Sequence, residues 1–494
     1  MKNLLYIISL CGLLTACDLQ EEPYGFYSDD NFYKSETDAE SGLLYAYNAL
    51  TFLEYSRGIF YIGDIPTETM SPKSDEAGDV YQLENWIANR ETEQLQYYFK
   101  YCYIAINRAN TVIDHIQNSS VLSETARRRI LGEAYFLRAW NYFNLVRTFG
   151  IVPVQTKMVA ELSQTTPPMA TGLDQLYDLI LGDLTRADNL LEVNKVFGRA
   201  DKVAAQSLMA KAYLTIASSK EHNVYRYTEM RREPQIMYDS AAYWAGKVVR
   251  DYKNVYDFDT NLRDIYDVDK PTGPEHIFIM PIDRSGTQEG NYSKLPLLFL
   301  PSNNSVPFYI RYGNGDLQRA NGNGWGVFLC NDEFVETQFS TTDKRRTELI
   351  HRDIYDASGN PIVPNQVKGY FSSKYVDPDF IGERTSARPY LIRFSDIALV
   401  YAEAAGPEAG LAYVNRIRER AGVTPLPSGM ATDKFREAVI KERALELAFE
   451  GNRLYDLRRT ASVTTTDIKA AGLSEAEAAY YPIPQREIDL NPNL

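Results

Sequence analysis

Apolar residues recur every three or four positions along most of the chain, which is the spacing of amphipathic helices. This pattern predicts helices over residues 36–57, 91–117, 123–149, 173–192, 201–218 and 237–252, with Asp201 as the N-cap of the fifth. Near the C-terminal end the same spacing predicts a helical hairpin broken at Gly406-Pro407. A further helix carries Ile440, Ala444 and Leu447 on one face. The expected fold is therefore mainly α.

The pattern changes between residues 253 and 392. Gly, Pro, Asn and Asp crowd together there, and short apolar runs such as Ile277 to Ile282 predict isolated strands. We expect a loop-rich region with short strands, inserted between scaffold parts at 36–252 and 393–494. The many aromatic residues of this region argue against disorder and favour a ligand-binding role.

Composition narrows the class of protein. The 494 residues are 44% hydrophobic and carry a net charge of -14, which is enough apolar material for a large core. An acidic surface repels phosphate backbones, so nucleic acid is not expected as a partner. Tyrosine is abundant, with 36 residues against 21 Phe and 4 Trp, and it offers an apolar face and a polar tip together.

The first residues resemble an export signal, predicted over 1–16. Lys2 precedes an apolar run that is shorter than the roughly 20 residues a membrane-spanning helix needs. The sequence LTAC, ending at Cys17, resembles a bacterial lipobox, so we expect Cys17 to carry lipid and to anchor the mature chain to a membrane. Residues 17–35 are then an acidic tether.

Cysteine and histidine give no sign of a metal site or cofactor. Cys11 leaves with the signal and Cys17 carries lipid, so only Cys102 and Cys330 remain. We favour two free buried thiols, with a disulfide as the alternative that the sequence leaves open. The four histidines are scattered without ligand spacing, and no cofactor is expected.

The segment 124–150 is apolar almost all round, which predicts a helix buried on most faces. Arg138 lies in its middle and either extends its charged end to the surface or pairs with an acid, because an unpaired buried cation is costly. We expect that partner in the late C-terminal helix, at Glu442 or Glu446.

Four segments in order resemble the SusD/RagB family of outer-membrane nutrient-binding lipoproteins. They are EAYFLRAWNYFNLVRTFG at 133–150, RFSDIALVYAE at 393–403 with NRIRERAG at 415–422, ERALELAFEGNRLYDLRR at 442–459, and YPIPQREIDLNP at 481–492. The resemblance implies a right-handed superhelix of four tetratricopeptide-like helix pairs, with a loop-rich region that holds the ligand site. It also implies a surface-exposed lipoprotein of the Bacteroidetes outer membrane that is not an enzyme. Such a protein captures glycans, or peptides as the alternative, and its partner is a SusC-like TonB-dependent transporter.

The ligand residues have to be predicted from chemistry. A sugar presents a flat patch of C–H groups and a rim of hydroxyls, so its capture needs an aromatic platform with planar polar neighbours. Trp140 and Trp244 lie within helical patterns and are expected in the core, whereas Trp86 and Trp325 lie in polar or glycine-rich stretches and are expected to contact ligand. The companions that share these stretches are Tyr81, Tyr292, Tyr309, Tyr312, Asn85, Asp64, Arg311 and Asn323.

Two other function classes are less well supported by the sequence. A glycoside hydrolase would need two carboxylates across a cleft, and no nucleophile elbow, metal motif or phosphate-binding loop accompanies the many acidic residues. A peptide-binding protein of the same transport system is the stronger alternative, because helical repeats commonly bind peptides on their concave face.

Overall fold

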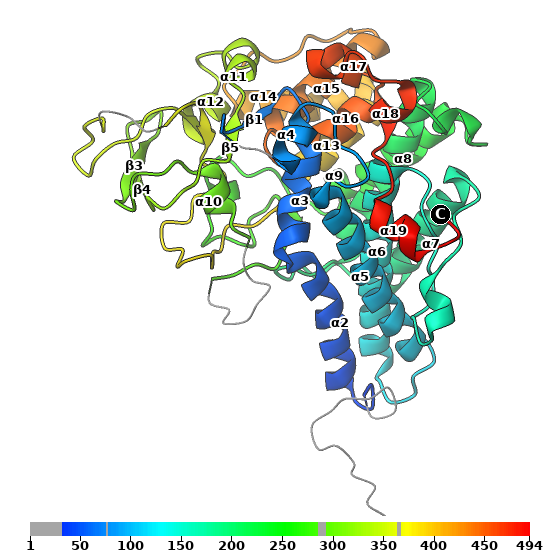
Figure 1. The fold of residues 1–494 in the computed structure, drawn as a ribbon. Coiled ribbons are helices and arrows are strands. Elements are labelled where there is room, and N and C mark those ends of the chain that lie inside the picture. Colours follow the sequence, from blue (N-terminus) through cyan, green and yellow to red (C-terminus); the bar gives the residue numbers. More distant parts are fainter. Residues whose placement is uncertain (1–31, 76–77, 285–292, 363–366) are drawn as a thin grey trace, which may run out of the picture.

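The computed structural model describes residues 32–75, 78–284, 293–362 and 367–494. In Figure 1 the helices α5 to α8 stand on the right, and the segment with β3, β4 and α10 projects on the left. The expected fold class, a helical-repeat scaffold with an inserted region of loops and short strands, is confirmed.

The first part of the chain forms an array of consecutive, neighbouring helices. Its elements are α2 (Glu36–Thr51), α3 (Leu53–Gly63), α4 (Asp79–Glu84), α5 (Glu93–Ile116), α6 (Glu124–Phe149), α7 (Leu173–Leu190), α8 (Lys202–Glu221) and α9 (Pro234–Asp251). From α5 to α9 each helix packs on the next one. Asp201 caps α8 as predicted, accepting the amide of Ala204 at 3.0 Å. The single helix predicted over 36–57 is divided at Phe52, whose ψ of 138° is not helical.

The C-terminal part extends this array. Its elements are α13 (Phe394–Ala405), α14 (Pro407–Arg420), α15 (Thr432–Glu446), α16 (Arg453–Arg459), α17 (Val463–Thr466), α18 (Glu475–Ala479) and α19 (Gln485–Leu490). Helix α13 packs on α9, and the predicted break lies at Gly406, whose φ is 78°. The chain then returns to α6, where the amide of Tyr481 donates to the carbonyl of Thr148 at 2.9 Å.

The strands form antiparallel pairs, and the described strands other than β1 lie between α9 and α13. The strands are β1 (Met70–Pro72), β2 (His276–Ile279), β3 (Phe308–Arg311), β4 (Leu317–Ala320), β5 (Phe328–Cys330), β6 (Ile350–His351), β7 (Phe371–Ser372) and β8 (Tyr390–Arg393). The pairs are β1 with β5, β2 with β8, β3 with β4, and β6 with β7. Three helices complete this region, α10 (Leu295–Phe299), α11 (Asp332–Gln338) and α12 (Lys344–Leu349), and short 3-10 turns stand at Leu162–Thr165, Tyr227–Glu229, Asp264–Tyr266 and Ile468–Ala470. The domain boundaries proposed above stay a prediction.

Helix α6 is buried on nearly all faces, as predicted, but the partner of Arg138 is not the expected one. Its guanidinium binds Asp183 of α7 with two hydrogen bonds, Nε to Oδ2 at 2.7 Å and Nη2 to Oδ1 at 2.8 Å. Glu442 and Glu446 are bound instead by other arginines, Arg345 and Arg393 among them. The expectation was wrong because α6 packs against α7, the next helix in the array, and the acids of α15 are closed off by their own partners.

Both remaining cysteines are free. Cys102 and Cys330 are buried, as favoured above, and burial raises the pKa of each thiol. Within the described ranges, no helix has the length and apolar character needed to cross a membrane. The predicted signal over 1–16 and Cys17 lie outside the described residues.

Candidate functional site

Trp325 is the tryptophan that the fold leaves most exposed. Its exposed fraction is 47%, against 8% for Trp86 and 5% for Trp140, and Trp244 is partly buried against the core. It stands in the loop 321–327 between β4 and β5. About half of this side chain is therefore open to a ligand, and tryptophan is enriched among residues that dominate binding.

The loop that carries Trp325 is held firmly. The Trp325 amide donates to the carbonyl of Leu297 at 2.6 Å, and the Gly326 amide donates to the carbonyl of Leu300 at 2.9 Å. A Cβ at position 324 would lie 2.0 Å from the oxygen of Leu300, so only glycine permits this close approach. The indole is therefore displayed on a fixed base, as a preorganised platform requires.

A charged side chain lies beside the indole. The Nζ of Lys294 lies 5.5 Å from the centre of the Trp325 ring and is fixed by an ion pair with Glu383 at 2.7 Å. Asn323 is exposed two positions before Trp325. We call Trp325, Asn323, Lys294 and Glu383 the Trp325 surface. It combines an apolar face with hydrogen-bond donors and acceptors, which suits a sugar ring.

Two of the predicted companions lie together on a neighbouring hairpin. In β3 the side chains of Phe308 and Ile310 are buried, whereas Tyr309 and Arg311 occupy the opposite face. The guanidinium of Arg311 lies 4.3 Å from the ring centre of Tyr355, which pairs with Tyr309 through the backbone. These residues come from a different loop than the Trp325 surface.

Tyr312 is placed by packing. It is buried at the end of β3, with the guanidinium of Arg263 lying 4.5 Å from its ring centre and its hydroxyl donating to Gln318. Burial raises its pKa to about 12. The ring lines a groove of about 580 Å³ together with Asp316 and Arg319.

The expectations for Trp86 and Asp64 need correction, because both side chains are closed to solvent. Trp86 donates its indole N–H to Asp467 at 3.2 Å and stacks on Tyr481 with ring centres 6.3 Å apart. Asp64 has no exposed surface and accepts the amide of Gly451 at 2.6 Å, and burial raises its pKa to about 7. Both residues anchor the C-terminal segment to the start of the chain, and neither offers a surface to a ligand.

The last predicted residues lie on or near α4. Tyr81 is 52% exposed, while Asn85 is the C-cap residue and donates its amide to the Tyr81 carbonyl at 2.9 Å. Tyr81 thus stays open to solvent and Asn85 is engaged in the cap. Tyr292 lies outside the described residues.

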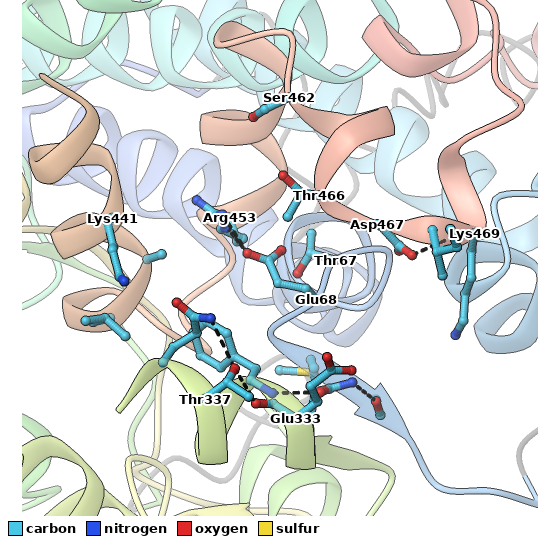
Figure 2. Close-up of a pocket in the computed structure, with 18 of the residues that line it drawn as sticks. Thr67, Glu68, Glu333, Thr337, Lys441, Arg453, Ser462, Thr466, Asp467 and Lys469 are labelled. Carbon is cyan, nitrogen blue, oxygen red and sulfur yellow. Dashed lines mark hydrogen bonds and ion pairs between the residues drawn. The ribbon is translucent and has the colours of Figure 1, made fainter. Parts of the chain in front are cut away.

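A polar cleft that the sequence did not indicate lies between α11, α15, α17 and the segment 65–71 (Figure 2). Its volume is about 660 Å³, and Glu68, Arg453, Thr337 and Lys441 are among its lining residues. Arg453 donates from Nε to Glu68 Oε1 at 2.7 Å, across 385 positions of sequence. No local spacing or periodicity connects residues so far apart, so sequence reasoning had no signal for this cleft.

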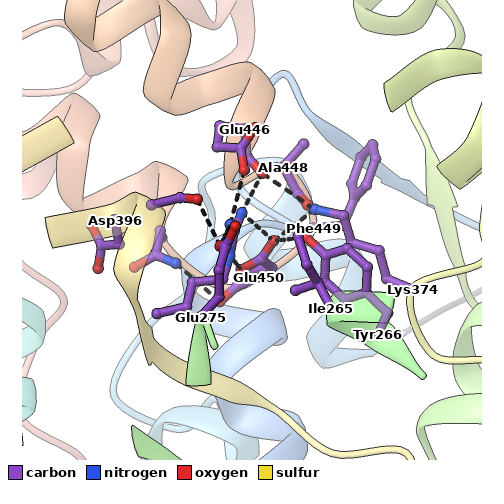
Figure 3. A network of polar contacts seen from close by, with 12 residues as sticks. Ile265, Tyr266, Glu275, Lys374, Asp396, Glu446, Ala448, Phe449 and Glu450 are labelled. Carbon is purple, nitrogen blue, oxygen red and sulfur yellow. Dashed lines mark hydrogen bonds and ion pairs between the residues drawn. The ribbon is translucent and has the colours of Figure 1, made fainter. Parts of the chain in front are cut away.

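A cluster of charged side chains around Arg393 is fully buried and closed to ligands (Figure 3). Arg393 binds Glu450, Glu275 and Glu446, each at 2.8 Å, and Lys374 binds Glu450 at 2.6 Å. Burial alone would raise the pKa of Glu450, but Arg393 and Lys374 lower it overall. These carboxylates are paired and unreachable, so they serve the fold and cannot serve as the two carboxylates of a glycoside hydrolase.

Two family models match the chain. Residues 33–214 match a family described as starch-binding associating with outer membrane, and residues 353–494 match the SusD family. The chain belongs to the SusD-like family. The first matched part holds helices α2 to α7 and most of α8, and the second holds β7, β8 and the C-terminal helices. Neither match includes the segment with β3 to β5.

Similar proteins span nearly the whole SusD-like chain. A SusD-like protein of Formosa agariphila is 26% identical over 99% of this chain and 97% of its own. A SusD homolog from Bacteroides thetaiotaomicron has a TM-score of 0.76 at 20% identity, covering 95% of this chain and 98% of that one. A structure described as a laminarin-binding SusD-like protein has a TM-score of 0.73 at 23% identity, covering 93% and 98%. At these identities the structures establish the fold.

Proposed function

We propose that this SusD-like protein binds oligo- or polysaccharide at the Trp325 surface and performs no chemistry on it. The observation that carries the proposal is the exposed indole of Trp325, fixed by backbone hydrogen bonds and flanked by Lys294, Glu383 and Asn323. The match to a family described as starch-binding, and the fold shared with a laminarin-binding protein, support the same ligand class.

The proposal extends to the cell surface. The lipobox-like sequence before Cys17 supports a lipid anchor on the outer membrane, and the family description names association with that membrane. In this setting the bound glycan passes to a partner TonB-dependent transporter. Growth with an alkyne-bearing fatty acid should label the full chain, and Cys17→Ser should abolish that labelling; a labelled Cys17→Ser variant would contradict the anchor.

Isothermal titration with laminarin and soluble starch tests the ligand class. We expect Trp325→Ala to weaken binding of the glycan that the wild type takes by at least tenfold, which is about 1.4 kcal/mol. Tyr243→Ala is the matched control, because Tyr243 is 54% exposed on α9 of the scaffold. Its affinity should equal that of the wild type. Unchanged affinity in Trp325→Ala refutes the Trp325 surface.

The same titrations separate the rival functions. Binding of a peptide mixture with no response to any glycan would favour the peptide-binding alternative and reject glycan capture. Release of new reducing ends during prolonged incubation with laminarin or starch would instead show an enzyme. We expect neither result.

A further inference from the structure

The polar cleft of Figure 2 shares no residue with the Trp325 surface. It is walled by α11 from the loop-rich region and by α15 and α17 from the C-terminal scaffold. Its lining includes apolar side chains such as Met70 and Ile440, and three hydroxyl-bearing residues, Thr337, Ser462 and Thr466. The volume of about 660 Å³ lies within the range of small-molecule sites in proteins.

Two polar atoms in the wall of the cleft lack partners. Arg453 uses Nε and Nη2 to bind Oε1 of Glu68, which leaves Oε2 of Glu68 and Nη1 of Arg453 buried and without a hydrogen bond among the described residues. A buried polar atom without a partner is costly, by about 1–3 kcal/mol. The free carboxylate oxygen is an acceptor and the free guanidinium nitrogen is a donor. Sugar hydroxyls, which both donate and accept, can supply the partners that these two atoms lack.

The charge of the cleft restricts the ligand further. Its lining holds five carboxylates, those of Glu68, Glu84, Glu333, Glu437 and Asp467. Against them stand three cations, those of Lys441, Arg453 and Lys469. The excess of negative charge repels anionic ligands such as sulfated or uronic saccharides. A neutral ligand rich in hydroxyl groups fits both the charge and the unpaired atoms.

We propose that the polar cleft is a second saccharide site for a neutral oligosaccharide, with Glu68 and Arg453 binding a pair of neighbouring hydroxyls. The inference rests on the proposed function and adds a site that is independent of Trp325. One chain then holds two saccharides at once, or two stretches of one polysaccharide.

Stoichiometry tests the second site. The probe is the neutral hexasaccharide of laminarin or of starch, whichever the wild type binds, in isothermal titration. Thr337→Arg should block the cleft, because Thr337 is exposed on α11 and lines it. The matched control is Thr341→Arg, since Thr341 is equally exposed just after α11 and does not line the cleft. We expect two ligands per chain for the wild type and for Thr341→Arg, and one for Thr337→Arg.

A second variant and a second readout guard against misfolding. Trp325→Ala should also bind one ligand, and the double variant with Thr337→Arg should bind none. In Trp325→Ala, ligand should alter the fluorescence of Trp86, whose indole donates to Asp467 in the cleft wall.

The outcomes separate the two proposals. One ligand per chain in the wild type, lost entirely in Trp325→Ala, overturns the second site and leaves the proposed function intact. Equal stoichiometry and affinity in Thr337→Arg and the wild type also overturns it. Binding that is lost in Thr337→Arg and kept in Trp325→Ala supports the cleft and rejects the Trp325 surface. Absence of binding to every saccharide rejects both proposals.

Discussion

Replacing Arg393 by Met should destabilise the fold more than any surface change. Arg393 is 1% exposed and binds the carboxylates of Glu275, Glu446 and Glu450. Methionine fills similar apolar space and supplies no charge, so three buried carboxylates each lose one cation. Removing one partner of a buried ion pair costs about 3–5 kcal/mol. Partners that remain, such as Lys374 on Glu450, keep the loss near that range.

The expected shift in thermal midpoint follows from the size of the chain. Unfolding entropy is about 2.1 cal/mol/K per residue, which gives about 1 kcal/mol/K for this chain of 494 residues. A loss of about 4 kcal/mol therefore lowers Tm by about 4 °C. Differential scanning calorimetry of the wild type and of Arg393→Met at pH 7 measures this difference in Tm.

The control is an ion pair of the same chemistry on the surface. Arg127 pairs with Glu124 on the exposed face of α6, and Arg127→Met should change stability by less than about 1 kcal/mol. The reasoning is refuted if Arg393→Met melts within 1 °C of Arg127→Met. Such a result would mean that the desolvation penalty of burying Arg393 is as large as its attraction to the three carboxylates.

Three further predictions concern the loop that carries Trp325, the buried Trp86 and the pH dependence of stability. Gly324→Ala should weaken glycan binding at least tenfold, because the added Cβ would collide with the Leu300 carbonyl. The control Gly182→Ala, whose Cβ would meet only Arg186 at 3.8 Å, should leave the glycan affinity unchanged. Trp86→Phe should lower the free energy of unfolding in urea by about 1 kcal/mol, because the hydrogen bond to Asp467 is lost. Its glycan affinity should equal that of the wild type, and a lower affinity would mean that Trp86 contacts the ligand. Burial lowers the pKa of His351 to about 3, so the folded state binds fewer protons than the unfolded state, and stability falls as pH drops from about 6.5 toward 3. Between pH 7 and pH 4.5 the free energy of unfolding, measured in urea, should fall by about 2–3 kcal/mol more for the wild type than for His351→Gln. Equal pH dependence in the two proteins would contradict the lowered pKa of His351.

The scaffold could be predicted because its information is local. The three- and four-residue spacing specifies each helix within its own segment, and caps such as Asp201 and breaks such as Gly406 mark the ends. The residue that the spacing could not place was Arg138. Burial of its helix predicts that a partner exists, but the identity of that partner depends on which helix packs alongside.

The ligand residues were harder because exposure is set by distant segments. Trp86 and Trp325 both stand in polar surroundings in the sequence. Residues 467 and 481 close over Trp86, whereas the described part of the chain leaves Trp325 47% exposed. The glycines around Trp325 were a true local signal, since Gly324 is required where the loop meets the Leu300 carbonyl. The polar cleft had no such signal, because its walls meet only in three dimensions.

The pairing of β1 with β5 has a consequence for how the chain reaches its native state. Asn331 bonds the Ser71 side chain across 260 positions, and the Gly451 amide reaches Asp64 across 387. The segment 64–72, which follows α3, therefore gains these partners only after most of the chain, up to Gly451, has been synthesised. Contacts of such long range slow folding and leave a strand edge unpaired in the meantime. A chaperone that covers the segment around β1 would shorten the time in which newly made chains can aggregate.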